Sequence, residues 1–312
     1  MITKKTLIFL IFISFTILMP AKEYASRFMD MGAGAKAAGM GMSGVAIADD
    51  AYATYWNPAG LMNLNKMDIN ASYSTFFGII NRKIINYAHP FGDGVLGIDY
   101  ISTWVDDIKN TTYTDNRPLD VGASFMYTAS VFILSKAGKL SDIYKFHNMD
   151  LFYGISIKLM GEGFSEKEGG SGIGLDIGLQ GQYASWLKWG INFQNIAKTS
   201  FEWDTPSKTV ELIPTIIKTG IAWQVFPRIA YILDLDFQEG QHPKYHTGFE
   251  YKLVNTFMKN IAYTLRAGLD NSNVTFGLGL NCNNFKLDYA YRKNRYHYLD
   301  DSVLISIGFN NK

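Results

Sequence analysis

Residues 274–292 read VTFGLGLNCNNFKLDYAYR, and apolar and polar side chains alternate through both halves of this stretch. The apolar set comprises Val274, Phe276, Leu278, Leu280 and Cys282, followed by Phe285, Leu287, Tyr289 and Tyr291. A period of two places successive side chains on opposite faces of a β-strand. The stretch therefore predicts two antiparallel strands that share an apolar face and are joined by a short turn at Asn283.

The same alternation recurs from about residue 66 to the end of the chain. We expect fourteen strands, at 66–77, 82–91, 94–104, 119–133, 149–164, 171–184, 186–197, 209–225, 227–238, 244–254, 260–269, 272–282, 284–294 and 301–310. Most of these segments reach the length of about 9 to 11 residues with which a tilted strand crosses a bilayer. An even number of antiparallel strands suits a closed barrel, because the first strand then starts and the last strand ends on the same side of the membrane.

The predicted connections alternate in length, as they do in outer-membrane barrels. Short turns are expected at 90–94, 185, 226–227 and 283, and longer loops at 105–118, 198–208 and 295–300. Two connections break the rule, because 270–271 is short and 134–148 is long. Most of the turns and loops therefore follow the order expected of a barrel.

The second face of the strands carries Gly, Ser and Asn with scattered charges. We expect the lumen of the barrel to hold Asp99, Asp176, Lys188, Asp234, Asp236, Arg266, Asp288 and Arg292. Acids and bases on neighbouring strands can pair across such an interior, or they can line a polar conduit. A soluble sandwich would show the same alternation, with its apolar face as the core. The strand number, the aromatic strand ends and the N-terminal signal described below favour the membrane barrel.

The composition excludes several classes of protein. The chain has 312 residues, of which 47% are hydrophobic, and 29 Lys and Arg stand against 28 Asp and Glu. This balance argues against a nucleic-acid partner, because binding to phosphates requires a basic face. The single cysteine, Cys282, excludes an internal disulfide framework.

Residues 1–21 have the pattern of a secretory signal peptide. Lys4 and Lys5 precede an apolar run at 6–19, which ends at Pro20. This run is shorter than the roughly 20 residues of a membrane-spanning helix, so a cleaved signal is favoured over an anchor. No later stretch is apolar enough to form a transmembrane helix, and we expect export to the outer membrane.

Residues 22–65 do not follow the strand period. Residues 31–42 are rich in Gly and Ala, whose small side chains allow close packing inside a confined space. An Asp of the pair at 49–50 is expected to cap the start of a short helix, which Asn57 and Pro58 stop. We therefore divide the chain into a signal peptide (1–21), a plug segment (22–65) and a barrel (66–312).

Three spaced motifs resemble the start of PorV/PorQ-type outer-membrane proteins, which are related to the FadL/TodX (OMPP1) transporters of hydrophobic compounds. They are RFMDMGAGAKAAGMG at 27–41, ADDA at 48–51 and YWNPAGL at 55–61. The resemblance implies a fourteen-stranded barrel with an N-terminal hatch in its lumen. By the same resemblance, the hatch would contain Asp49, Asp50, Tyr55, Trp56, Asn57, Pro58, Ala59 and Gly60.

No motif in the sequence indicates catalysis, and we expect no enzyme, no cofactor and no metal site. No Gly-x-Ser-x-Gly nucleophile motif is present. His242 and His246 have the spacing of two metal ligands on a helix. Their context is a strand, where four residues span about 13 Å, too far for one ion.

Three functions remain open. Passive uptake of a hydrophobic small molecule predicts an apolar entry site near the outer mouth, for which the candidates are Trp104, Phe164 and Trp203. A membrane adaptor that holds secreted proteins predicts ordered external loops at 105–118 and 198–208. Both functions require outer-membrane lipid around the barrel, whereas a secreted soluble structural β-protein would not.

Overall fold

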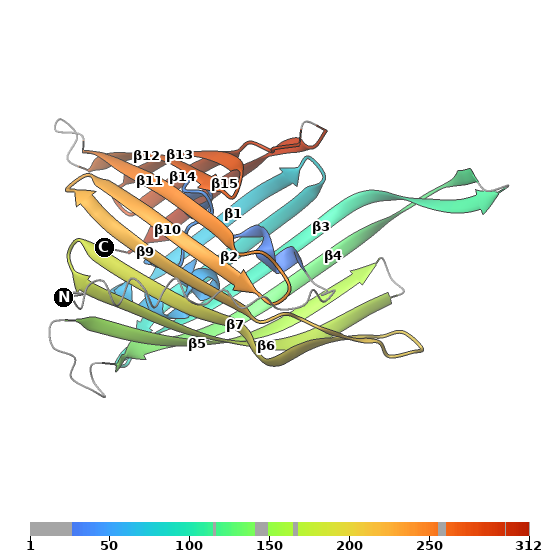
Figure 1. Ribbon diagram of the computed structural model, residues 1–312, viewed down its shortest axis with the longest axis horizontal. Coiled ribbons are helices and arrows are strands. Elements are labelled where there is room, and N and C mark those ends of the chain that lie inside the picture. Colours follow the sequence, from blue (N-terminus) through green and yellow to red (C-terminus); the bar gives the residue numbers. More distant parts are fainter. Residues whose placement is uncertain are drawn as a thin grey trace, which may run out of the picture.

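The computed structural model describes residues 27–114, 117–140, 149–164, 168–254, 260–296 and 298–311. The predicted signal peptide, residues 1–21, lies outside these ranges. Within them, antiparallel strands form one sheet that closes on itself around four short helices (Figure 1).

The closed ring contains fourteen strands. The described residues form fifteen strands, of which all except β8 belong to the ring: β1 (Asp68–Phe77), β2 (Ile80–Phe91), β3 (Gly94–Thr114), β4 (Arg117–Lys139), β5 (Asp150–Phe164), β6 (Glu168–Ala184), β7 (Leu187–Trp203), β8 (Val210–Leu212), β9 (Ile216–Phe226), β10 (Ile229–Gln238), β11 (Lys244–Val254), β12 (Ile261–Asp270), β13 (Asn273–Cys282), β14 (Phe285–Arg292) and β15 (Asp300–Asn310). First and last strands pair, as β1 with β15, and β7 pairs with both β6 and β9. The short β8 pairs only with β7 and adds no member to the ring. The predicted fourteen-stranded antiparallel barrel is confirmed.

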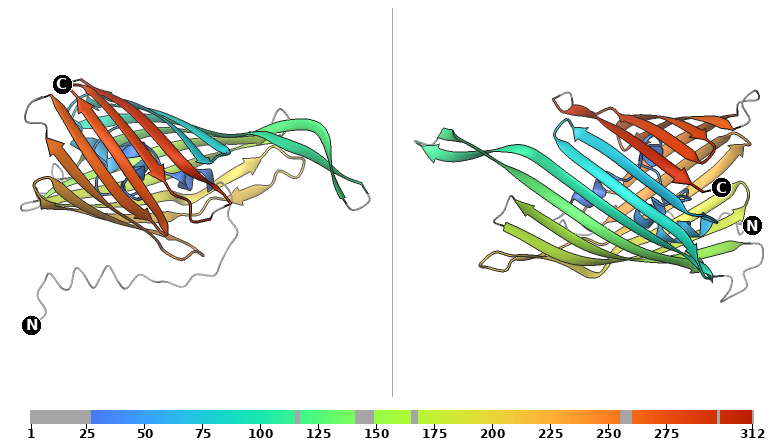
Figure 2. Two further views of the ribbon diagram at one scale, coloured as in Figure 1. Left: turned by 90° about the horizontal axis from the view of Figure 1, so that it is seen from above. Right: turned by 180° about the vertical axis from the view of Figure 1, so that it is seen from behind.

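The two ends of the barrel differ in shape. We call the end at which β1 begins the proximal end; β15 also ends there, because the strands are antiparallel and even in number. At the opposite, distal end, the ribbon formed by β3 and β4 extends far beyond the other strands (Figures 1 and 2).

The lumen face of the wall is polar and the outward face is apolar. On the lumen side Arg82, Asp99 and Lys158 are buried. On the outward side Ile173 and Phe285 are 67% and 63% exposed. A soluble protein buries its apolar face and exposes its polar one. A barrel surrounded by lipid requires an apolar outward face, as found here.

Residues 27–65, which we call the lumenal segment, lie inside the ring of strands (Figures 1 and 2). The segment forms η1 (Arg27–Met31), α2 (Ala35–Ala38), α3 (Ala53–Trp56) and η2 (Pro58–Asn63). Helix α2 contacts β13 to β15, and η2 contacts β3 to β6, so the segment crosses the lumen from one side to the other. None of the helices in the described ranges has the length and apolar character that crossing a membrane requires.

The predicted start of the central helix is wrong, and its predicted end is confirmed. Helix α3 follows Tyr52, and no side chain caps it. Asp50 instead accepts the backbone N–H of Tyr52 at 3.0 Å, in the turn before the helix. The helix ends at Trp56, and the Asn57 side chain then accepts the N–H of Ala59 at the start of η2.

Two predictions about the distal end are also wrong. The expected loop at 105–118 belongs to the ribbon of β3 and β4, whose strands pair as far as Thr114 and Arg117. Residues 111–114 read TTYT, and Thr and Tyr favour extended backbone. The expected strand at 209–225 is split into β8 and β9 around Pro214, which has no N–H to donate to the sheet.

Candidate functional site in the barrel lumen

The lumenal segment is bound to the wall mainly through its own backbone. Side chains from strands on several sides of the ring supply the partners. The pairs are Ala35 N–H with Ser306 (2.8 Å), Gly41 N–H with Thr275 (2.9 Å), the Ala46 carbonyl with Gln180 (3.0 Å) and the Trp56 carbonyl with Asn192 (3.0 Å). Backbone groups buried in this way need such partners, because water cannot reach them.

Glycines on both surfaces let the segment lie directly against the wall. Gly39 faces Gly277 on β13, where a Cβ added to Gly39 would lie 2.8 Å from the Cα of Gly277. Gly41 has a φ of +70°, and a Cβ there would lie 2.4 Å from the carbonyl oxygens of Leu269 and Thr247. A larger residue at either position would have to displace the backbone of the wall.

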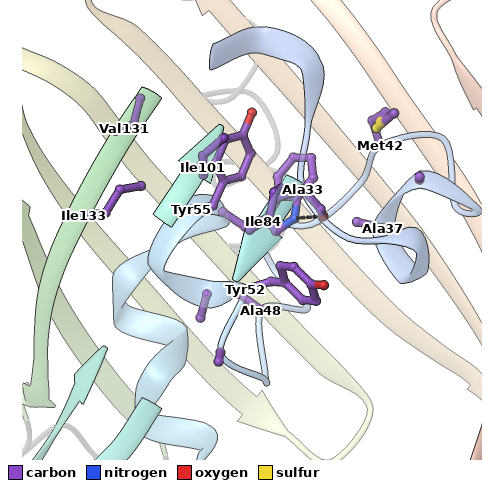
Figure 3. Close-up of a cluster of buried hydrophobic side chains, with 14 of the residues drawn as sticks. Ala33, Ala37, Met42, Ala48, Tyr52, Tyr55, Ile84, Ile101, Val131 and Ile133 are labelled. Carbon is purple, nitrogen blue, oxygen red and sulfur yellow. Dashed lines mark hydrogen bonds between the residues drawn. The ribbon is translucent and has the colours of Figure 1, made fainter. Parts of the chain in front are cut away.

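Tyr55 and Trp56 belong to the buried core of the segment. Figure 3 shows Tyr55 beside the wall residue Ile84 of the same core. The two rings meet edge to face, with centroids 5.0 Å apart. Trp56 Nε1 donates to the Ala33 carbonyl at 2.8 Å, and the Tyr55 hydroxyl accepts the Gly32 N–H at 3.0 Å. The two rings therefore join the stretch at residues 32–33 to helix α3.

Asn57 joins the segment to β6. Its Nδ2 donates to the Val45 carbonyl at 3.1 Å and to the Leu179 carbonyl at 3.0 Å. Its side chain is fully buried, so these bonds are shielded from water. The remaining hatch candidates of this stretch lie buried in η2: Pro58, Ala59 and Gly60.

Lys36 and Asp49 form an ion pair on the proximal side of the segment, with 2.5 Å between Nζ and Oδ1. Although burial disfavours charge on both groups, their attraction lowers the pKa of Asp49 to about 2 and raises the pKa of Lys36. Burial raises the pKa of the neighbouring Asp50 to about 6, and the charge of Asp49 acts in the same direction. Asp50 therefore titrates just below neutral pH.

A cavity of about 210 Å³ lies between the segment and the distal end of the wall. Its apolar floor is formed by Met31, Met42, Tyr55 and Trp56, together with Phe76, Phe77 and Ile216 of the wall. Its rim contains the ion pairs Lys218–Asp236, Arg292–Asp270 (2.7 Å) and Lys244–Asp30 (3.6 Å). The charges of the rim neutralise one another, and the floor offers contacts to an apolar molecule.

Two smaller cavities lie deeper in the lumen. A cavity of about 20 Å³ inside the segment is lined in part by Trp56, Lys36 and Ile47. A cavity of about 110 Å³ at the proximal end is lined in part by Lys36, Ile47, Lys188 and Glu250. Trp56 also borders the distal cavity, so neighbouring cavities share lining residues, and the three follow one another in a series from the distal to the proximal end.

The lumen charges selected from the sequence lie on the inner face, each in a defined place. Asp236 and Arg292 belong to the distal rim, and Lys188 lines the proximal cavity. The other contacts are Asp99 with the Thr54 hydroxyl (3.0 Å), Asp176 with Lys158 (2.6 Å), Asp234 with the N–H groups of Gly44 (2.7 Å) and Val45 (2.9 Å), and Arg266 with Glu250 (2.9 Å) and Asp288 (2.5 Å).

The sequence-based candidates did not include Arg82, His246 or Asp270, which also face the lumen. Arg82 is fully buried, and its Nη1 donates to the carbonyl of Phe28 at 2.5 Å. His246 lies 3.0 Å from Asp270 and 3.5 Å from Asp236. Arg82 and His246 stand at lumen-facing positions of their predicted strands, so a complete count of the alternation would have found them. Asp270 was placed in the predicted turn at 270–271, whereas β12 extends to include it.

Two of the three entry candidates come together. The rings of Phe164 on β5 and Trp203 on β7 are stacked, with centroids 6.2 Å apart, and Phe201 packs against Trp203 at 5.2 Å. Trp104 points to the opposite face of the sheet, where its ring lies 6.3 Å from that of Tyr73. The aromatic cluster of the distal lumen therefore does not contain Trp104.

His242 and His246 both line the distal cavity. The Nδ1 atom of His246 lies 3.1 Å from the Gly41 carbonyl oxygen, which connects the wall to the lumenal segment. Within the part of the chain that the structure describes, no group of three or more His, Cys, Asp and Glu side chains is placed to hold a metal ion.

The architecture is shared with solved transport proteins. The toluene transporter TodX of P. putida superimposes with a TM-score of 0.62 at 10% identity, over 90% of this chain and 99% of that chain. The toluene transporter TbuX of Ralstonia pickettii gives 0.60 at 12% identity, over 90% and 98% of the two chains. This barrel has the TodX fold.

A FadL homologue of Pseudomonas aeruginosa has the same architecture, with a TM-score of 0.55 at 11% identity over 89% of this chain and 98% of that chain. No protein-family model and no curated protein sequence matches the chain. TodX and TbuX are transporters and not enzymes. At these identities the likeness concerns the fold alone.

Proposed function

We propose that this protein is an outer-membrane barrel that lets hydrophobic small molecules pass from its distal to its proximal side. The observation that carries the proposal is the series of three cavities through the lumenal segment. The apolar outward face supports a position in a membrane. The fold shared with TodX, TbuX and the monoaromatic hydrocarbon channel CymD supports this class of cargo.

The ligand would enter beside Phe164 and Trp203. Their stacked rings stand at the distal end of the lumen face, and aromatic faces bind apolar molecules without requiring hydrogen bonds. The ion pairs of the distal rim favour a neutral ligand, because a charged one would have to compete with existing partners. From the rim the ligand would reach the apolar floor around Trp56.

The lumenal segment would act as the hatch. The Trp56 ring stands between the distal and middle cavities, and the Lys36–Asp49 pair stands beside the proximal one. Displacement of the lumenal segment as one unit, residues 49–60 included, would join the cavities into a passage. The strands would remain closed during this movement, because they pair with one another and not with the segment.

A reversible tether tests the hatch. Ala35 N and Ser306 Oγ lie 2.8 Å apart, so cysteines at these two positions can be crosslinked in a Cys282→Ser background. Vesicles with a lipopolysaccharide outer leaflet resist toluene, and wild-type protein is expected to speed its entry. The oxidised Ala35→Cys, Ser306→Cys protein should lose this gain, and a reductant should restore it; oxidised Ala35→Cys alone is the control.

The outcomes separate the two parts of the proposal. Equal toluene entry through the oxidised and reduced double variant would refute the hatch while leaving transport intact. Entry through wild-type protein no faster than through protein-free vesicles would refute transport itself.

A second function, holding exported proteins outside the membrane, is favoured by the distal ribbon. Pairing of β2 with β3 ends at Val105, and pairing of β4 with β5 ends at Tyr127. Beyond these residues the ribbon, 106–114 with 117–126, continues as a two-stranded arm that extends past the other strands of the wall (Figures 1 and 2). An arm that stands clear of the barrel in this way could offer an exported protein an extended surface to bind.

Shortening the ribbon tests this second function. Val105 and Tyr127 are opposite each other, so an Asn-Gly turn can replace residues 106–126. If the ribbon holds exported proteins, the shortened barrel should lose specific co-purifying proteins while toluene entry is unchanged. An identical set of partners before and after shortening would exclude the adaptor role for the ribbon.

A further inference from the structure

An open groove lies on the outward face of the wall near the proximal end. It spans β1, β13, β14 and β15, has a volume of about 430 Å³ and is almost entirely apolar. Its walls include Ile69, Ala71, Leu280, Phe285, Ile307 and Phe309. The groove therefore crosses the β1–β15 pair, which joins the first strand of the barrel to the last.

Ala71 is a small residue in the floor of the groove. Its outward neighbours on β1 are Ile69 and Tyr73, and its cross-strand partners are Ile85 and Ile307. All four of these neighbours are larger and at least 38% exposed, so they stand above the alanine on every side. One small residue thus leaves a hollow in an otherwise bulky apolar surface.

The proximal border of the groove has a different chemistry. Three chain segments meet there, 65–67, 283–284 and 310–311, and they are connected by backbone hydrogen bonds. The Asn310 N–H donates to the Asn284 carbonyl at 2.9 Å, and the Asn311 N–H donates to the Met67 carbonyl at 3.3 Å.

The side chains of this border are amides with one cation. They are Asn65, Lys66, Asn283, Asn284, Asn310 and Asn311, and the three segments contain no carboxylate. Lys66 and Asn65 are exposed. Amide N–H groups and an ammonium are donors to phosphate oxygens, so the border complements an anion beside an apolar groove.

We propose that the groove binds one acyl chain of a glycerophospholipid from the membrane leaflet at the proximal end, with the phosphate at the Lys66 border. The inference rests on the proposed membrane position, and not on transport. An acyl chain matches a long apolar groove, and a phosphate matches the donors beside it. The bound lipid would cover the strand pair at which the barrel closes.

Native mass spectrometry of the full chain in detergent provides the test. After delipidation, phosphatidylglycerol with two 16-carbon chains is added to wild-type protein, Ala71→Phe and Ala267→Phe. Ala267 is an exposed outward alanine on β12, outside the groove, so its variant is the matched control. Ala71→Phe fills the groove with a residue that a lipid-facing strand accepts.

Wild-type protein and Ala267→Phe should each retain one phosphatidylglycerol. Ala71→Phe should bind this lipid at least about tenfold more weakly, because about two methylenes of its acyl chain would lose their contacts. Lys66→Gln should weaken phosphatidylglycerol without affecting dipalmitoylglycerol, which has no phosphate. Equal retention by Ala71→Phe and Ala267→Phe would overturn the proposal. A second barrel or another protein in place of the lipid would also overturn it.

The failure of this inference is distinguishable from failure of the proposed function. If wild-type protein does not insert into phosphatidylglycerol vesicles, the membrane position itself is wrong. If it inserts but retains no lipid after delipidation and addition, only the groove is wrong. Toluene entry should be unchanged in Ala71→Phe, because the groove and the lumen lie on opposite faces of the wall.

Discussion

The carboxylate of Asp234 on β10 accepts the backbone N–H of Gly44 at 2.7 Å, across 190 residues of sequence. The same oxygen accepts the N–H of Val45 at 2.9 Å. Asp234 is only 1% exposed, so water does not compete for these bonds. A Cβ added to Gly44 would lie 2.3 Å from the Trp56 ring, so the same turn also positions the central tryptophan of the segment.

Asp234→Ala should loosen the lumenal segment without opening the barrel. Two buried N–H groups would lose their acceptor, and each such group costs about 1–3 kcal/mol. Hydrogen exchange of residues 40–56 should therefore accelerate by tenfold or more, while the strand amides keep their protection. Ser302→Ala is the control, since the Ser302 hydroxyl is buried and has no hydrogen-bond partner among the described residues. Unchanged exchange in Asp234→Ala would show that other contacts hold the turn.

Gly41→Ala should destabilise the docked segment more than Gly92→Ala destabilises its turn. Both glycines have positive φ, at +70° and +64°, so alanine costs about 1 kcal/mol of backbone strain at each. Only at position 41 would the new Cβ also meet wall carbonyls at 2.4 Å, which adds about 1–3 kcal/mol. Urea unfolding of both variants in detergent micelles measures the loss of stability in each. Equal effects of the two substitutions would mean that the segment can shift away from the wall at little cost.

Lys158→Met should destabilise the barrel strongly, and a second change should reverse most of the loss. Lys158 and Asp176 are 1% and 2% exposed and form an ion pair at 2.6 Å. Removing one buried charge leaves the other without its partner, at a cost of about 3–5 kcal/mol. Adding Asp176→Asn removes that charge and retains an oxygen for the Asn195 N–H, which Asp176 accepts at 2.9 Å.

Urea unfolding of the two variants in detergent micelles provides this comparison. The double variant should recover most of the free energy of unfolding lost in Lys158→Met. A double variant as unstable as the single one would indicate that Lys158 stabilises the wall through packing rather than charge.

Docking of the segment should strengthen as the pH falls from 7 to about 4.5. The pKa of Asp50 is about 6 in the docked segment and 3.8 in water, so the docked form takes up the proton first. The gain ends below 3.8, where Asp50 is protonated in both states. Asp49 acts in the opposite sense, but with a docked pKa of about 2 it weakens docking only below 3.8.

Hydrogen exchange of the segment, corrected for the intrinsic pH dependence, measures this gain. As the pH falls, protection should rise by a total factor of roughly ten for each unit of difference between the pKa of Asp50 in the docked segment and its pKa in water. Asp50→Asn should be more protected than wild type at pH 7 and should gain less protection than wild type between pH 7 and 4.5. If Asp50→Asn kept the wild-type pH dependence, another lumen group would be responsible.

The entry candidates show where prediction from sequence stops. Along β7, Asn192 and Gln194 face the lumen at even positions, but Thr199 and Phe201 face it at odd ones. The register of β7 shifts between them. A bulge of this kind exchanges the two faces of a strand, and it brings Trp203 to the lumen beside Phe164. Alternation counted along the sequence does not reveal such a shift.

The alternation of side chains by itself predicted fourteen antiparallel strands, each with one apolar and one polar face. That information is local, because each strand shows its two faces within about ten residues. The lumen pairs, the cavities and the groove at Ala71 were decided only by the tertiary structure. They depend on strand register and on close approach of distant segments, as between Asp234 and Gly44, and neither is encoded within a single strand.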